Sequence, residues 1–406
     1  MSPLRKWLVI AVAVTTTIVT WGAVLSAFPL ISLDWGKDFS ASHGVIMMAL
    51  TLSPLGQGAL SPLAGYAVGK LSVRNLLLIG LALSAAGLAL VAVSNAMWQV
   101  LVVYAILLAA GTVLTGPLIT SVLAVRLFSE SKGLATGIVT MGVGLSAVVM
   151  PPVVKLLLGG GDWRMVLVEI ALFIALVLAP IVFVLVGEAR PSGEDAAAKH
   201  AAEPTLTMGQ IARDRVFWGL SLAFMPLAFM FNGLYFNVGF SLADQGGTAG
   251  QAAAVLTAGG MASLPGMLLF GGLADRVRPL PLFIVTVVGM AAMATVSALT
   301  GSYNVLIVSV PAWTFFQGGA MTLIPVNFAT RFGAANFARA NGLGMALSSV
   351  MISGAAVAGY GRDVLGSYHA AFTLMLVVVP LSLLALMLLV GSRPYGHKLT
   401  PSVAGE

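Results

Sequence analysis

The sequence predicts an all-α membrane protein with twelve transmembrane helices in two pseudo-symmetric six-helix bundles. Hydrophobic residues make up 59% of the 406 residues and charged residues only 8%, whereas soluble domains carry about 25% charged residues. Because so few charges cannot cover the surface of a soluble protein of this size, lipid must be the outer solvent. The net charge of +6 therefore concerns membrane orientation rather than nucleic-acid binding.

An internal repeat divides the chain into two halves of equal length. Three landmarks recur at an offset of 205 or 206 residues: Gly65–Lys70 with Gly271–Arg276, Arg126 with Arg331, and Gly161 with Gly366. The landmarks lie between long apolar runs, so each half is a membrane bundle. Parallel repeats of this kind are typical of membrane proteins that bind their ligand near the bilayer midplane, between the repeats.

Each half contains about six runs that reach the roughly 20 apolar residues of a transmembrane helix. The expected spans are 8–33, 43–68, 76–93, 98–125, 134–158 and 165–186 in the first half, and 216–242, 252–273, 280–299, 305–329, 341–360 and 370–390 in the second. No segment shows the alternation of a β-strand, which argues against a membrane barrel.

The polar segments then set the domain boundaries. We expect an N-terminal bundle at 1–187, a cytoplasmic linker at 188–215, a C-terminal bundle at 216–392 and a cytoplasmic tail at 393–406. Within the linker, Ala196–Ala202 is either a short surface helix or a flexible segment.

The distribution of basic residues predicts the orientation. Twelve spans place both termini and the linker on one side, which then holds sixteen of the 20 basic residues. The other four are Lys37, Lys155, Arg164 and Arg362. Both termini are therefore expected in the cytoplasm of a multi-pass protein, with a bacterial inner membrane as the expected location. The first apolar run is too long for a signal peptide and is expected to remain as the first span.

Two motifs resemble known sequences. Gly271–Arg276, in the turn after the eighth span, resembles the G-x-L-A-D-R loop signature of the major facilitator superfamily. Arg126–Ile138 and Gly366–Phe372 resemble segments of its monocarboxylate and oxalate-formate antiporter branches. The resemblance implies the fold of this superfamily and a secondary active transporter. It would move a small organic monocarboxylate by alternating access, with symport as the expected mode and the coupling ion left open. The midplane Trp, Tyr and Phe residues, which include Phe229 and Phe231, suit a substrate with a hydrophobic or aromatic body.

Charged residues at the loops form the expected gating set. Asp275 can sit at a helix N-terminus, where its charge suits the helix dipole, and the neighbouring arginine can pair with acidic groups. Together these residues can hold the cytoplasmic side in one conformation, as a latch. In the first half Gly69 replaces the aspartate, so the latch of that half is weakened or absent. The gating residues are Arg126, Lys132, Asp275, Arg276 and Arg331. Two roles remain open for Arg126: it guides an anionic substrate, or it packs within the cytoplasmic loop.

The resemblance also places the substrate cavity between the first, fourth, seventh and tenth spans. Polar and aromatic residues lie at midplane depth in these spans, Thr115 among them. The expected substrate-binding residues are Trp21, Thr112, Asn232, Tyr235, Trp313 and Gln317. Their amides, phenol and indoles can supply neutral donors to a substrate. Interhelical hydrogen bonding or packing is the alternative role. The arginine usual in the eighth span is missing, because Leu264 and Leu268 occupy its expected place.

Other chemistry is not indicated. The sequence shows no metal-ligand cluster, no nucleophile–base arrangement and no G-x-x-x-x-G-K-[ST] loop, so no enzyme, cofactor or metal is expected. The expected partners are a small molecule and the lipid bilayer, with a coupling proton left open and no nucleic acid. Lys155 and Glu169 lie at similar depths and are read as an interfacial ion pair or a coupling site. An exporter of neutral or lipophilic compounds, or a non-transporting receptor on the same fold, remains an alternative.

Overall fold

The computed structural model describes residues 3–41, 43–128, 131–159, 162–186 and 206–390, which include helices but no strand. Eleven helices in these ranges are long and apolar enough to cross a membrane. The 25-residue helix α4 (His43–Ala67), at the expected second span, is not among the eleven. The all-α membrane fold expected from composition is confirmed. The segment Ala196–Ala202 lies outside the described residues.

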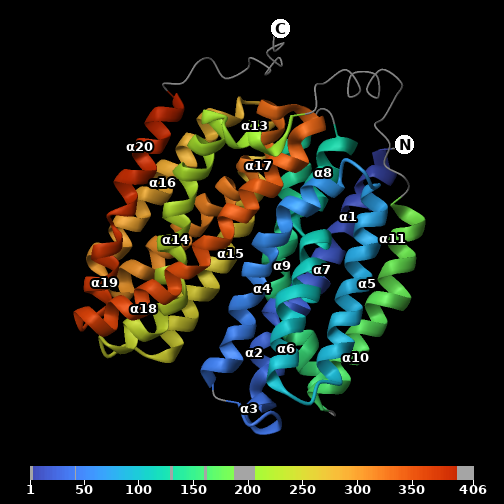
Figure 1. Ribbon diagram of the computed structural model, residues 1–406. Coiled ribbons are helices and arrows are strands. Elements are labelled where there is room, and N and C mark those ends of the chain that lie inside the picture. The colour runs from blue at the N-terminus through green and yellow to red at the C-terminus, as the bar shows by residue number, and fades with distance from the viewer. Residues whose placement is uncertain (1–2, 42, 129–130, 160–161, 187–205, 391–406) are drawn as a thin grey trace. The chain divides into compact units, whose positions relative to one another are not determined.

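The chain forms two compact units, each described by itself. The first unit comprises Met1–Ser129, Ile138–Glu203 and Asn341–Ser349. Three π-helical turns, η1, η3 and η4, interrupt its spans. Its described elements (Figure 1) are α1 (Pro3–Trp21), η1 (Gly22–Ser26), α2 (Phe28–Ile31), η2 (Ser32–Asp34), α3 (Trp35–Asp38), α4, α5 (Val73–Ala92), α6 (Met97–Val103), η3 (Tyr104–Leu108), α7 (Ala109–Thr115), α8 (Pro117–Leu127), most of α9 (Lys132–Leu158), α10 (Trp163–Phe173), η4 (Ile174–Leu178) and α11 (Ala179–Leu185).

The second unit comprises Glu130–Gly137, Pro204–Ala340 and Val350–Glu406. Its helix α17 breaks at Gly333, whose φ of 73° lies in the left-handed region that glycine tolerates. This break separates the tenth and eleventh spans. The described elements (Figure 1) are α13 (Met208–Ala212), α14 (Arg215–Ala243), α15 (Ala249–Ala274), α16 (Pro279–Thr300), most of α17 (Tyr303–Ser348), most of η5 (Ser349–Ser353), α18 (Gly354–Leu365), α19 (Tyr368–Met375) and α20 (Val378–Val390).

Polar side chains cap the N-termini of the membrane helices α14 and α15. The Asp214 carboxylate accepts hydrogen bonds from the N–H groups of Val216 (2.7 Å) and Phe217 (3.2 Å) at the start of α14. Thr248 and Gln251 form a capping box at the start of α15. These side chains satisfy N–H groups that have no partner within the first helical turn.

Apolar side chains are exposed on both units, as a bilayer requires. Leu63 and Leu156 of the first unit are 64% and 80% exposed, and Met387 of the second is 70% exposed. Inside the first unit, α5 and α7 approach closely through two glycines. A Cβ atom at Gly80 would lie 3.1 Å from the carbonyl oxygen of Gly111. Small residues at such crossings are typical of membrane helices, which pack without a hydrophobic driving force between them.

Candidate functional site

Helices α14 and α17 of the second unit carry four of the predicted substrate residues, and Phe231 of α14 contacts two of them. The ring of Phe231 stacks on Tyr235 with 4.9 Å between centroids and meets Trp313 edge-on at 5.4 Å. Trp313 is fully buried, whereas Asn232, Tyr235 and Gln317 are half-buried. The three rings therefore form one aromatic cluster, and none of these residues carries a charge.

Hydrogen bonds within the unit use the donors of two of these residues. The Asn232 amide donates both hydrogens, to the carbonyl oxygens of Ala228 (2.8 Å) and Met351 (3.3 Å). The Tyr235 hydroxyl donates to the carbonyl oxygen of Leu256 at 3.0 Å. What both side chains still offer is acceptor capacity. Their role toward a substrate stays a prediction.

Trp313 and Gln317 differ from their neighbours because they are unpaired. In the described part of the chain, Trp313 Nε1 and Gln317 Oε1 are buried atoms with no hydrogen-bond partner. The two residues are four positions apart on α17, and such residues share one helix face. A buried polar atom without a partner costs free energy, so these two atoms stand out as candidate ligand contacts.

The two predicted residues of the first unit have their hydrogen bonds satisfied. The Trp21 indole donates to the carbonyl oxygen of Thr112 at 3.2 Å, and the Thr112 hydroxyl donates to Leu108 at 2.8 Å. Gly116 is extended, and Pro117 begins the next helix. The last carbonyls of α7 therefore lack helical partners, and Trp21 supplies one. This pair serves helix packing in the observed conformation.

The predicted gating aspartate caps a helix. The Asp275 carboxylate accepts hydrogen bonds from the N–H groups of Gly133 (2.6 Å) and Leu134 (2.9 Å), at the start of α9. Glycines allow the approach, because a Cβ atom at Gly271 would lie 2.7 Å from the carbonyl oxygen of Gly133. The negative charge at a helix N-terminus is the arrangement expected from the sequence.

The basic gating residues occupy three different environments. Arg331 forms an ion pair with Asp214 at 2.8 Å, with side chains only 14% and 5% exposed. Arg126 is half-buried and donates to the carbonyl oxygen of Val68 at 3.4 Å, just before the turn that carries Gly69. The remaining two, Lys132 and Arg276, are exposed.

The expected contact between Lys155 and Glu169 is not formed: no ion pair joins them among the described residues. Both side chains lie on exposed faces of their helices, α9 and α10. Similar depth along the sequence therefore did not bring these two side chains into contact.

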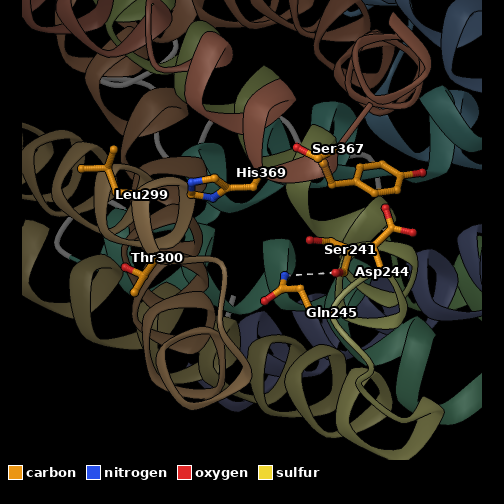
Figure 2. Close-up of a pocket in the computed structure, with 8 residues that line it drawn as sticks. Ser241, Asp244, Gln245, Leu299, Thr300, Ser367 and His369 are labelled. Atoms are coloured by element: carbon orange, nitrogen blue, oxygen red, sulfur yellow. Dashed lines mark hydrogen bonds between the residues drawn. The ribbon is translucent and has the colours of Figure 1, made fainter. Parts of the chain in front are cut away.

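The second unit also contains a pocket that sequence reasoning did not identify. Its volume is about 350 Å³, and it lies where α14 and α16 end and α19 begins. Figure 2 shows the Gln245 amide bonded to the carbonyl of Ser241 inside it. The lining residues are Ser241, Asp244, Gln245, Leu299, Thr300, Ser367, Tyr368 and His369. In the sequence, the signal available for this pocket was the Gly366-Ser367-Tyr368 pattern, because Ser367 and Tyr368 line it.

Comparisons with known proteins agree with this architecture. The family model described as Major Facilitator Superfamily matches residues 10–356. The chain is 25% identical to the oxalate:formate antiporter of Oxalobacter formigenes, over 82% of this chain and 79% of the relative. It is also 25% identical to monocarboxylate transporter 11 of Mus musculus, over 90% of this chain and 83% of the relative.

Solved structures show the same fold. The E. coli fucose:proton symporter FucP aligns with a TM-score of 0.68 and 16% identity, over 95% of this chain and 99% of that one. The human organic anion transporter MFSD10 aligns with a TM-score of 0.70 and 17% identity, over 96% and 100%. Because the family match extends over most of its length, this chain belongs to the Major Facilitator Superfamily and is a multi-pass membrane transporter of that family.

Proposed function

We propose that this protein is a secondary active transporter of small organic monocarboxylates that works by alternating access. The observation that carries the proposal is its similarity, over most of both chains, to an oxalate:formate antiporter and to a monocarboxylate transporter. A substrate of this class combines a small carboxyl group with an apolar body. The rings of Phe231, Tyr235 and Trp313 suit such a body.

The proposed substrate residues divide into two kinds. Asn232, Tyr235, Trp313 and Gln317 form the polar and aromatic contact surface of the second unit. Trp21 and Thr112 contribute through the helix break at Gly116, which their hydrogen bond stabilises. The lack of a charged side chain in the eighth span means that no fixed counter-charge binds the carboxyl group there.

The proposed gate relies mainly on Asp275. Its two hydrogen bonds to the start of α9 hold the turn after the eighth span against that helix. In the first half Gly69 cannot make such bonds, and Arg126 instead holds the end of α4 through the Val68 carbonyl. Lys132, Arg276 and Arg331 set the charge of these loops. Conformational cycling therefore depends more on the second loop than on the first.

The proposal includes an orientation and a domain plan. The bundles correspond to 1–187 and 216–392, with the linker 188–215, the tail 393–406 and both termini in the cytoplasm. The 16-to-4 distribution of basic residues supports this orientation, and a bacterial inner membrane is the proposed location.

One alternative has its own supporting observation. The uncharged aromatic surface of α14 and α17 also suits an exporter of neutral or lipophilic compounds. A receptor without transport activity is the remaining alternative, since a fold alone does not fix function.

Reconstitution separates these functions. Purified protein in proteoliposomes is given radiolabelled monocarboxylates and, separately, radiolabelled lipophilic amines. The proposal predicts saturable uptake of at least one acid that unlabelled acid suppresses. Saturable movement of amines alone favours the exporter, and binding without any movement favours the receptor.

A further inference from the structure

The pocket at the end of α14 is separate from the aromatic cluster of Phe231, Tyr235 and Trp313, because none of these residues lines it. Tyr235 precedes Asp244 by nine residues, or about 13.5 Å along a helix. Side chains from the ends of α14 and α16 and from the start of α19 surround the pocket (Figure 2). Its volume of about 350 Å³ lies within the range of small-molecule sites, about 300–1,000 Å³. The pocket can therefore hold a small organic molecule.

The carboxylate of Asp244 gives this pocket a negative charge. Its partner is Arg362, whose Nε and Nη2 atoms both lie 3.4 Å from the carboxylate oxygens. Strong charge-assisted hydrogen bonds are shorter, about 2.7–2.9 Å, and both side chains are open to water, 43% and 36% exposed. The same guanidinium lies 3.6 Å from the carboxylate of Asp363. One cation therefore serves two carboxylates, which leaves one negative charge unbalanced.

No other charged side chain in the surrounding helices balances it. Apart from Arg362 and Asp363, helices α14, α16, α18 and α19 contain one Asp, Glu, Lys or Arg residue, which is Arg215 at the far end of α14. Tyr368 and His369 also line the pocket. Tyrosine and histidine side chains in water are mainly uncharged at pH 7.5. The pocket therefore favours a cation at that pH.

The amide of Gln245 adds an acceptor of fixed orientation. Its nitrogen donates to the carbonyl oxygen of Ser241 at 3.0 Å and to that of Gly301 at 3.1 Å. Turning the amide over would bring its oxygen against these two carbonyl oxygens, so Oε1 stays the atom offered to a ligand. The neighbouring residues Asp244 and Gln245 therefore both present acceptors.

The remaining lining suits the carbon atoms of an organic cation better than a metal ion. Leu299 is 56% exposed, and the ring of Tyr368 packs against Phe240 and Phe372, with 6.4 and 5.8 Å between centroids. Among the described residues, no group of three or more His, Cys, Asp or Glu side chains could hold a metal ion. Hard metal cations need several oxygen ligands close together.

We propose that this pocket binds a small organic molecule that carries a primary ammonium group. The ammonium N–H groups donate to the Asp244 carboxylate and to Gln245 Oε1, and the apolar body lies against Leu299 and Tyr368. A carboxylate is disfavoured because it meets the unbalanced negative charge and cannot donate to either acceptor. A neutral alcohol can donate but gains no attraction between charges. The site is independent of the proposed monocarboxylate function. A free amine and the ethanolamine headgroup of a phospholipid share this chemistry.

Protection of a cysteine in the pocket tests the inference. Thr300→Cys places a thiol in the lining of this cysteine-free chain, and Asn304→Cys is the matched control because Asn304 is exposed and does not line the pocket. Purified full-length protein in phosphatidylcholine nanodiscs at pH 7.5 is treated with N-ethylmaleimide, an uncharged reagent. The probes are benzylammonium, benzyl alcohol and benzoate, which share one ring and differ in charge.

Benzylammonium should slow the modification of Thr300→Cys in a saturable way and leave Asn304→Cys unaffected, whereas the other two probes should slow neither. Adding Asp244→Asn should raise the half-protecting concentration about three- to tenfold, because one hydrogen bond to a charged group is weakened. Adding Arg362→Gln should lower that concentration about two- to fivefold, because the competing cation of an exposed pair is removed. General damage to the pocket would not change the two variants in opposite directions.

Nanodiscs that also contain phosphatidylethanolamine distinguish the two sources of the ammonium group. Slower modification of Thr300→Cys without added amine, reversed by Asp244→Asn, identifies the headgroup as the occupant, and an unchanged rate identifies a free amine. Equal protection by benzyl alcohol or benzoate would overturn the inference. Protection that Asp244→Asn leaves unchanged, or no protection by either ammonium source, would also overturn it. Each of these failures leaves the monocarboxylate function standing, because uptake tests that function separately.

Discussion

The substitution Asp275→Asn examines the proposed gate most sharply. The Asp275 carboxylate accepts two backbone N–H groups, at 2.6 Å from Gly133 and 2.9 Å from Leu134. Asparagine keeps one acceptor oxygen but turns an N–H₂ group toward the second backbone N–H, so one charge-assisted bond is lost. Such a bond contributes about 1.5–3 kcal/mol. If only one state of the transport cycle contains this contact, the equilibrium between states shifts by about 10- to 100-fold.

The assay is the transport rate in proteoliposomes at saturating substrate, with the amount of reconstituted protein measured separately. Asp275→Asn should lower this rate strongly. Gly69→Asn, at the equivalent position of the first half, serves as the matched control and should have a small effect because the first loop has no aspartate to lose. Equal, negligible effects of both substitutions would refute the reasoning, since neither loop would then control cycling.

Three further predictions follow from the charged residues. A cysteine placed at Ala196 in this cysteine-free chain should resist an impermeant reagent added outside intact cells; labelling from outside would contradict the orientation. Arg126→Gln should lower the maximal transport rate and leave the Kd for an acid unchanged, whereas a tenfold higher Kd would assign the guanidinium to substrate binding. Arg331→Met leaves the buried Asp214 without its cation and should reduce stability by about 3 kcal/mol, measured by thermal unfolding in detergent. The exposed Arg276→Met is the control for that last substitution, and equal melting curves would show that the ion pair adds nothing.

The fold was largely predictable because lipid restricts the spanning structures to a few solutions. The expected third span, Leu76–Val93, corresponds to α5 (Val73–Ala92), and the expected seventh, Val216–Leu242, to α14 (Arg215–Ala243). In both cases the length of the apolar run determines where the helix begins and ends. The loop signature that contains Asp275 also indicated a position at a helix N-terminus, where its carboxylate accepts two backbone N–H groups.

The hydrogen bonding of the candidate site was not predictable. Asn232 donates to Met351, which is 119 residues away in the sequence, and no local pattern indicates where such a carbonyl lies. The break at Gly116 frees the carbonyl that Trp21 uses, but glycine and proline are frequent in membrane helices without such a role. Which donors remain free is therefore a property of the tertiary structure.

Uptake of a labelled monocarboxylate into proteoliposomes that contain only this protein tests the central claim most directly. The liposomes are preloaded with unlabelled acid, and labelled acid is added outside at the same pH on both sides. The account predicts transient accumulation of label above its equilibrium level, because the carrier exchanges internal for external substrate, and loss of that accumulation without internal acid. Label that enters no faster than in protein-free liposomes, for every monocarboxylate that binds, would contradict it.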